Sequence, residues 1–226
     1  MQWLINFFAS SIGKKIIMSL TGLFLILFLI VHLIGNLQLL QPDGDAFNGY
    51  TYFMTHNPLI KTISYGLYFF ILLHAFQGLI LAANNRSAKG SKYSVATKEN
   101  AKWAAKRMAF LGLLILAFLL LHMGDFWLKM KMDQLNMVDV SMYDHPVKDL
   151  YSRVYVTFGE LWIVIVYIIG LLALYFHLDH GFQSSFQTLG INHKKYTPTI
   201  KFLGKAYAIL VPLGFAIIPL YIYFTK

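Results

Sequence analysis

Four of the eight histidines lie inside long apolar runs of the sequence. They occur in the segments LIVHLIGN, ILLHAFQG, LLLHMGDF and LYFHLDHG, as His32, His74, His122 and His177. An ionisable side chain in such a run is costly to bury, so it marks a candidate functional residue. An imidazole can bind a metal, carry a proton or hydrogen-bond to a neighbouring helix. One histidine in each of four successive runs favours a shared functional role over four unrelated contacts.

Helices that cross a bilayer must position these histidines. A hydrocarbon core of about 30 Å needs about 20 apolar helical residues. Five segments meet that length, at about 16–33, 59–82, 108–127, 154–176 and 202–224. The composition agrees, with 58% hydrophobic and 13% charged residues, against about 45–50% and 25% in soluble domains. The predicted fold class is an all-α integral membrane bundle of five helices in one domain, 1–226.

Two parts of the chain outside these segments also have an expected structure. Residues 1–13 should form a short interfacial helix, with Trp3, Phe7 and Phe8 on its apolar side. The connection from 129 to 152 carries four aspartates, and we expect it to be a solvated outer loop.

Basic residues are divided unevenly between the two sets of connections. Thirteen of the nineteen lysines and arginines fall in the set that begins with Lys14, and six in the set that ends at Lys226. The richer side of a multi-pass protein normally faces the cytoplasm. The sequence therefore predicts a cytoplasmic N-terminus and an outside C-terminus. This bias also accounts for the net charge of +9, so no nucleic-acid partner is expected.

The direction of each segment sorts the histidines by depth. Segments one and three run outward, and His32 and His122 lie near their outer ends. Segments two and four run inward, and His74 and His177 lie toward their inner ends. Two histidines on facing helices at one level can supply both axial ligands of a haem iron. The pairing therefore predicts two b haems, and the absence of cysteine excludes covalent haem attachment and thiolate-bound clusters.

Nearby residues leave alternatives open. His180 rivals His177 as the fourth ligand, because the two are three residues apart and point roughly the same way on a helix. Gly170 shares a face with His177, and Gly78 with His74, which would leave room for a flat macrocycle. Small residues are also common wherever membrane helices touch.

Two carboxylates lie near the expected outer haem. Glu160 is the only carboxylate that the segment boundaries place well inside a span, and Asp125 follows the third of the four histidines by three residues. Either could accept protons from a quinol oxidised near the outer haem. Toward the inner side, Ser19, Arg107 and Lys14 are candidates for holding haem propionates. The positive-inside bias alone would explain the two charges.

The motifs LIVHLIGN, LLHAFQG, LLHMGDFW and YFHLDHGFQSSFQTLGI, in this order, resemble the haem-ligand regions of a known family. It is the single-subunit, five-helix, dihaem cytochrome b anchor (b558 type) of succinate dehydrogenase and fumarate reductase, known as complex II. SLTG, which contains Ser19, and KRMAFLG, which contains Arg107, look similar as well. The likeness covers nearly the whole chain from about residue 12. It implies the same pairs, His32 with His122 for the distal haem and His74 with His177 for the proximal one.

The resemblance also implies partners. These are a quinone, usually menaquinone, and separate flavoprotein and iron–sulfur subunits on the cytoplasmic face of a bacterial cytoplasmic membrane. The chain would be a non-dehydrogenating electron-transfer subunit, and a dimer of the whole complex is compatible with that role. One alternative is a cytochrome b anchor of another dehydrogenase, such as a hydrogenase or formate dehydrogenase. A second is a haem-free transporter or assembly protein that uses membrane histidines as proton relays.

Overall fold

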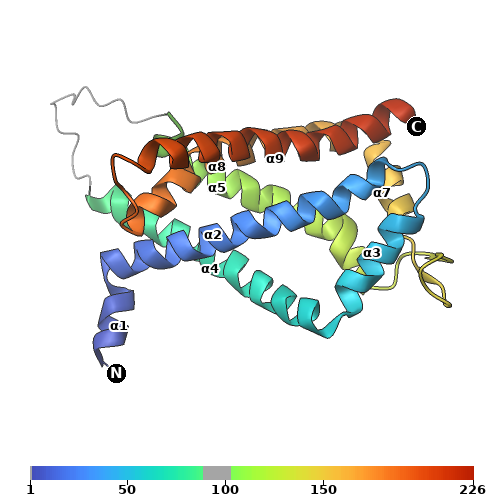
Figure 1. Cartoon of the computed structure of the whole chain (residues 1–226), viewed down its shortest axis with the longest axis horizontal. Helices are drawn as coiled ribbons and strands as arrows, with labels where there is room; N and C mark the ends of the chain where they lie inside the picture. The colour runs from blue at the N-terminus through green and yellow to red at the C-terminus, as the bar shows by residue number, and fades with distance from the viewer. Residues whose placement is uncertain (1, 89–102) are drawn as a thin grey trace.

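Five long helices form the body of the protein in the computed structural model, which describes residues 2–88 and 103–226 (Figure 1). They are α2 (Ser11–Asn36), α4 (Pro58–Ala88), α5 (Trp103–His122), α8 (Leu161–Thr188) and α9 (Thr197–Thr225). Each belongs to a segment long and apolar enough to cross a membrane, which confirms the all-α class and the five candidate spans. The orientation remains a prediction. Four lysines that contribute to it, Lys89, Lys92, Lys98 and Lys102, lie outside the described residues.

The fourth span lies further along the chain than the predicted range of 154–176. A separate helix, α7 (Leu150–Phe158), ends at Gly159, and α8 begins only after Glu160. The apolar run continues through this break, so hydropathy alone placed the start of the span too early. Glu160 is therefore not inside the span, as the sequence suggested, but exposed at the N-cap of α8.

A short helix precedes the first span. A short helix expected over 1–13 is present over a narrower range as α1 (Gln2–Ala9), and Figure 1 shows that it turns away from the axis of α2; its place at a membrane interface remains a prediction. Ser10 separates the two helices, because its hydroxyl accepts a hydrogen bond from the Gly13 amide at 3.0 Å and so caps α2. Trp3 is exposed, as an interfacial aromatic side chain should be.

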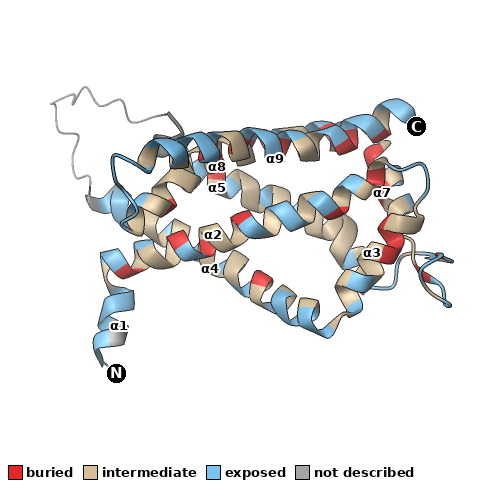
Figure 2. Cartoon of the chain, viewed as in Figure 1, coloured by how far each residue is buried: buried red, intermediate tan, exposed pale blue. Residues whose placement is uncertain are grey.

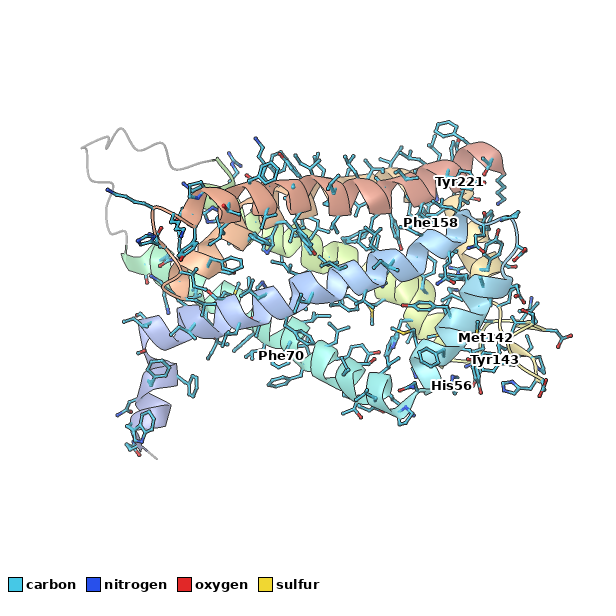
Figure 3. The ribbon with its side chains drawn as sticks, viewed as in Figure 1. His56, Phe70, Met142, Tyr143, Phe158 and Tyr221 are labelled. Carbon is cyan, nitrogen blue, oxygen red and sulfur yellow. The ribbon has the colours of Figure 1, made fainter. Side chains whose placement is uncertain are left out.

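The segment after α5 is largely exposed, as expected of a solvated loop, and it also folds into an ordered cap that the sequence did not predict. Its elements are the π-helical turn η2 (Met123–Leu128), α6 (Lys129–Lys131), β1 (Met137–Val138), β2 (Val147–Lys148) and α7. The two strands pair antiparallel, with Val138 opposite Val147. Together with η1 (Leu37–Leu40) and α3 (Asp45–His56) they close what we term the capped end, where Met142, Tyr143 and His56 lie (Figure 3). Sequence polarity missed the cap because its buried apolar anchors, Val140 and Val147, are few.

Polar contacts tie the cap together. Asn48 of α3 is 2% exposed. Its amide nitrogen donates to Asp149 Oδ1 at 3.0 Å, and its amide oxygen accepts from the Tyr151 backbone at 2.9 Å. Asp45 accepts two hydrogen bonds from Ser141, which hold the pKa of this aspartate below its ordinary value. The cap thus joins α3, the hairpin and α7 through satisfied polar groups.

Buried residues lie on the inward faces of the helices (Figure 2). The largest buried cluster lies toward the capped end and consists of Leu39, Phe47, Val154, Phe158, Val164, Tyr167, Ile218 and Ile222. A second cluster holds α2, α8 and α9 together through Ile26, Leu178 and Ala208, and the Tyr207 hydroxyl donates to the Ile26 carbonyl at 2.6 Å. Large apolar side chains such as Leu27, Phe69 and Leu120 remain exposed. Such extensive apolar exposure is what a lipid-facing surface requires.

Candidate functional site

The four histidines come together as two pairs. His32 of α2 and His122 of α5 have ring centroids 5.7 Å apart. His74 of α4 and His177 of α8 have ring centroids 6.2 Å apart. We call these the outer and the inner pair. The structure thus brings together the residues that the depth argument paired, and iron ligation by them remains a prediction.

The ring separations fit bis-imidazole ligation. With metal–nitrogen bonds of about 2 Å, two imidazoles on opposite sides of one metal have centroids about 6 Å apart. Edge-to-face packing of aromatic rings covers a similar range of about 4.5–7 Å, so distance alone fits both arrangements. Within the described ranges, no three His, Cys, Asp or Glu side chains gather into a metal-binding group. Two axial histidines nevertheless suffice for a haem, because the porphyrin supplies the other four nitrogens.

Two of the four histidines have an unsatisfied ring nitrogen. The Nδ1 atoms of His122 and His177 are buried without a hydrogen-bond partner in the described part of the chain, and so is Trp127 Nε1. Burying a polar atom without a partner costs about 1–3 kcal/mol. Such atoms are normally satisfied by water or a bound group, and a metal bound at Nε2 would leave Nδ1 still in need of one. One such histidine lies in each pair.

Thr21 makes a side-chain contact with His74. The Thr21 hydroxyl lies 2.8 Å from the Ile17 carbonyl and 3.0 Å from His74 Nδ1. When Nδ1 carries the imidazole proton, the Thr21 oxygen accepts it and Nε2 is left free as a ligand. Thr21 is 3% exposed. Thr21 lies in the SLTG stretch with Ser19, the predicted propionate ligand, whose hydroxyl donates to the Lys15 carbonyl within α2. Nothing in the sequence sets Thr21 apart from other threonines in apolar runs.

The glycines near the histidines serve helix packing. A Cβ on Gly170 would lie 2.5 Å from a ring carbon of Phe118, and one on Gly78 would lie 3.1 Å from the Met18 methyl. Side chains of neighbouring helices thus pack against both glycines, and room for a macrocycle beside them remains a prediction. The ring contact of His74 with His177 favours His177 over His180 as its partner.

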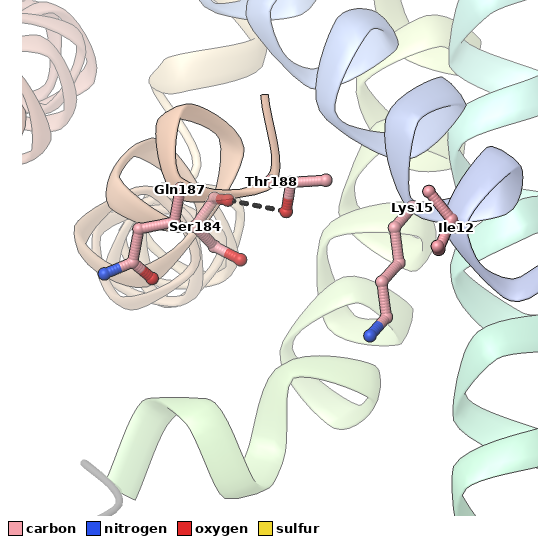
Figure 4. Close-up of a pocket in the computed structure, with 5 residues that line it drawn as sticks. All are labelled: Ile12, Lys15, Ser184, Gln187 and Thr188. Carbon is pink, nitrogen blue, oxygen red and sulfur yellow. Dashed lines mark hydrogen bonds between the residues drawn. The ribbon is translucent and has the colours of Figure 1, made fainter. Parts of the chain in front are cut away.

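A polar cavity of about 290 Å³ opens at the end of the bundle opposite the cap, which we term the basic end (Figure 4). Its lining comprises Ile12, Lys15, Ser184, Gln187 and Thr188. Positions 177 and 184 are two helical turns apart, so the cavity lies on the same face of α8 as the inner-pair histidine. Lys15 was missed as a candidate because the positive-inside bias makes each lysine near this boundary look alike. Of the sequence candidates, Lys14 does not line the cavity and Arg107 is exposed on α5.

The outer pair lies beside a network of polar side chains. Arg153 Nη2 is 3.5 Å from Asp125 Oδ1, and the Tyr167 hydroxyl donates to Asp125 Oδ2 at 3.5 Å. The Tyr167 ring lies 6.1 Å from the His122 ring. Asp125 is thus linked to the outer pair through one aromatic side chain. Arg153 entered the sequence argument only as part of the charge count.

Comparison of the chain with protein-family models, with curated proteins and with solved structures gives no match. The resemblance to dihaem cytochrome b anchors accordingly rests on the sequence motifs. A function for the chain has to be argued from those motifs and from the geometry of the two histidine pairs.

Proposed function

We propose that the chain is the membrane anchor and electron-transfer subunit of a complex II-type succinate:quinone oxidoreductase, and that it holds two b haems. The observation that carries the proposal is that the four histidines form two pairs, with ring centroids 5.7 Å apart in one and 6.2 Å apart in the other. Each bound haem would supply a one-electron redox centre whose potential its surroundings tune. Flavin and iron–sulfur chemistry would belong to separate subunits docked at the basic end.

The protein's own residues have distinct tasks in this proposal. His32 and His122 would hold one haem, and His74 and His177 would hold the other. Thr21 holds the proton of His74 on Nδ1 and so keeps the other nitrogen available. At the basic end, the Lys15 ammonium and the hydroxyls of the polar cavity offer charge-assisted hydrogen bonds to the propionates of the inner haem.

The capped end is the proposed side of quinone chemistry. A quinol that loses two electrons must also release two protons, and a nearby carboxylate can accept them. Asp125 is the better placed of the two candidates, because it contacts Tyr167, which packs near His122. Glu160 is exposed at the start of α8, where water can take protons without it.

Haem content tests the proposal directly. The purified full-length chain should give two b haems per polypeptide in a pyridine haemochrome assay, and acid acetone should extract both because no cysteine anchors them. A preparation that binds no haem after growth with added haem would contradict the proposal and favour the proton-relay alternative. One haem per chain would contradict the dihaem assignment.

A further inference from the structure

A π-helical turn begins at the residue after His122. η2 (Met123–Leu128) interrupts the regular spacing between α5 and α6. Such turns are rare and occur frequently at functional sites. The sequence MGDFWL contains no proline. Contacts from another part of the chain reach this turn.

Arg153 of α7 holds both the main chain and the side chain of one residue in η2. Its Nε donates to the Asp125 carbonyl at 3.1 Å, and its Nη2 lies 3.5 Å from Asp125 Oδ1. A guanidinium presents its donors in a planar, fixed arrangement, so two contacts to one residue restrict the orientation of that residue. The two side chains are 24% and 29% exposed, so water screens the pair only in part.

Packing connects this turn to His122. Phe126 of η2 has its ring 5.5 Å from the His122 ring. The rings of Phe126 and His122 both lie near the ring of Tyr167, at 6.3 and 6.1 Å. Tyr167 is 5% exposed, and its hydroxyl contacts the carboxylate that Arg153 holds. A shift of η2 would therefore move the rings that surround His122.

We propose that Arg153 is a positioning residue that pins η2 in its π-helical form through Asp125 and thereby orients the His122 imidazole. The second part rests on the proposed function, because it requires an outer haem that His122 ligates. The inner pair, which lies away from the cap, should not depend on Arg153.

The test compares three variants of the full-length chain. Arg153→Ala removes both contacts, whereas Arg153→Lys keeps the charge and loses the planar fork. Lys148→Ala is the matched control, because Lys148 also donates to a backbone carbonyl at this end, that of Met130 at 2.7 Å, which lies in α6 and not in η2. The first readout is hydrogen exchange of peptides covering 123–128, which needs no haem. The second is the low-spin electron paramagnetic resonance signal of each haem.

Arg153→Ala should speed exchange in 123–128 on the order of tenfold and should shift only the outer haem signal. Arg153→Lys should produce the same signal shift with normal protein yield, and Lys148→Ala should change neither readout. Unchanged exchange in Arg153→Ala would overturn the pinning of η2, and an equal shift of both haem signals would overturn the selective orientation. A wild-type chain without haem would contradict the proposed function and the claim that Arg153 orients a haem ligand. The hydrogen-exchange result would still decide whether Arg153 pins η2.

Discussion

The two histidine pairs are held in place by different parts of the molecule. In the inner pair, His74 is oriented by Thr21, a residue of a neighbouring span. In the outer pair, His122 precedes a π-helical turn that α7, an element of the cap, holds from outside the spans. His74 is thus positioned by a side-chain contact between two spans, and His122 by an element of the cap. Changes in the cap should therefore reach one pair and spare the other.

The ligand assignment gives the largest expected effect. His32→Ala or His122→Ala should remove one haem, the same one in both variants, and His74→Ala or His177→Ala should remove the other. Loss of one axial ligand leaves the iron with a single protein bond, so retention of that haem falls sharply. Haem content and a reductive titration of the purified variants measure both the number and the identity of the haem lost.

His180→Ala is the control for the fourth ligand and should keep both haems, because His177 is the residue whose ring lies 6.2 Å from His74. If His180→Ala loses a haem and His177→Ala does not, the inner pair is wrong. If substitution of one outer and one inner histidine removed the same haem, the arrangement of the histidines at two levels would be contradicted.

The histidine pairs could be anticipated from the sequence because helical spans run in alternating directions, which fixes the depth of each residue. The start of the fourth span could not be predicted, because the residues on either side of Glu160 are equally apolar. The break between α7 and α8 is visible only in three dimensions. The Asp125–Arg153 contact also escaped detection, since it joins residues 28 positions apart. Hydropathy reports which residues leave water and carries little information about which polar side chains meet.

The two carboxylates at the capped end provide the second comparison. Asp125→Asn keeps the shape of the side chain, its reach toward Tyr167 and the backbone carbonyl that Arg153 binds, but it cannot take a proton. It also removes the charge that Arg153 pairs with, so an unchanged outer haem signal is required before the result is assigned to proton transfer. It should slow quinone-linked turnover on the order of a hundredfold, the usual contribution of a general base, while dye reduction by the soluble subunits stays normal. Glu160→Gln should have a smaller effect, because that side chain is exposed at the N-cap of α8. The opposite ranking in a quinol oxidation assay would move the proton acceptor to Glu160.

Removal of the Thr21–His74 hydrogen bond should weaken binding of the inner haem only, and by less than loss of a ligand. Thr21→Val keeps the shape of the side chain and removes the acceptor for His74 Nδ1, so affinity for the inner haem should fall about 10–100-fold. Thr21→Ser is the matched control, because it restores the hydroxyl. Haem retention during dilution, followed by the absorbance of each haem, measures the effect. Equal loss from both pairs would show that the substitution damages the bundle as a whole.

The neighbour of Nδ1 differs between the two pairs. In His32 it is the amide nitrogen of Asn36, a donor, whereas in His74 it is the hydroxyl oxygen of Thr21. The Asn36 amide donates to the His32 carbonyl at 2.7 Å and lies 3.3 Å from His32 Nδ1. Ligation through Nε2 requires the proton on Nδ1, so Asn36 has to turn its oxygen toward the ring. Asn36→Asp supplies an acceptor in place of the amide and should lower the potential of the outer haem, because an acceptor makes the ligating imidazole more basic. A redox titration in which only the inner haem shifts would contradict this contact.

Acid should loosen the capped end before the rest of the bundle. Hydrogen bonding and charge from Lys148 hold the pKa of Asp133 below its ordinary value of 3.8, as the Ser141 hydrogen bonds do for Asp45. A carboxyl group whose pKa is lower folded than unfolded stabilises the fold above the unfolded pKa and loses that contribution as pH falls through the folded pKa. The contribution should therefore be complete at pH 5 and decline below about pH 4.

Both carboxylates are exposed, so the effect is small and is best measured locally. Hydrogen exchange of peptides from the hairpin should rise between pH 5 and 3, after correction for the intrinsic pH dependence, while peptides from the centre of α8 remain protected. Asp45→Asn cannot gain a proton and should reduce the pH-dependent part at its contact with Ser141. Equal acid sensitivity of the hairpin and of α8 would show that the cap and the spans unfold together. The cap could then not position the outer histidine pair independently of the inner pair.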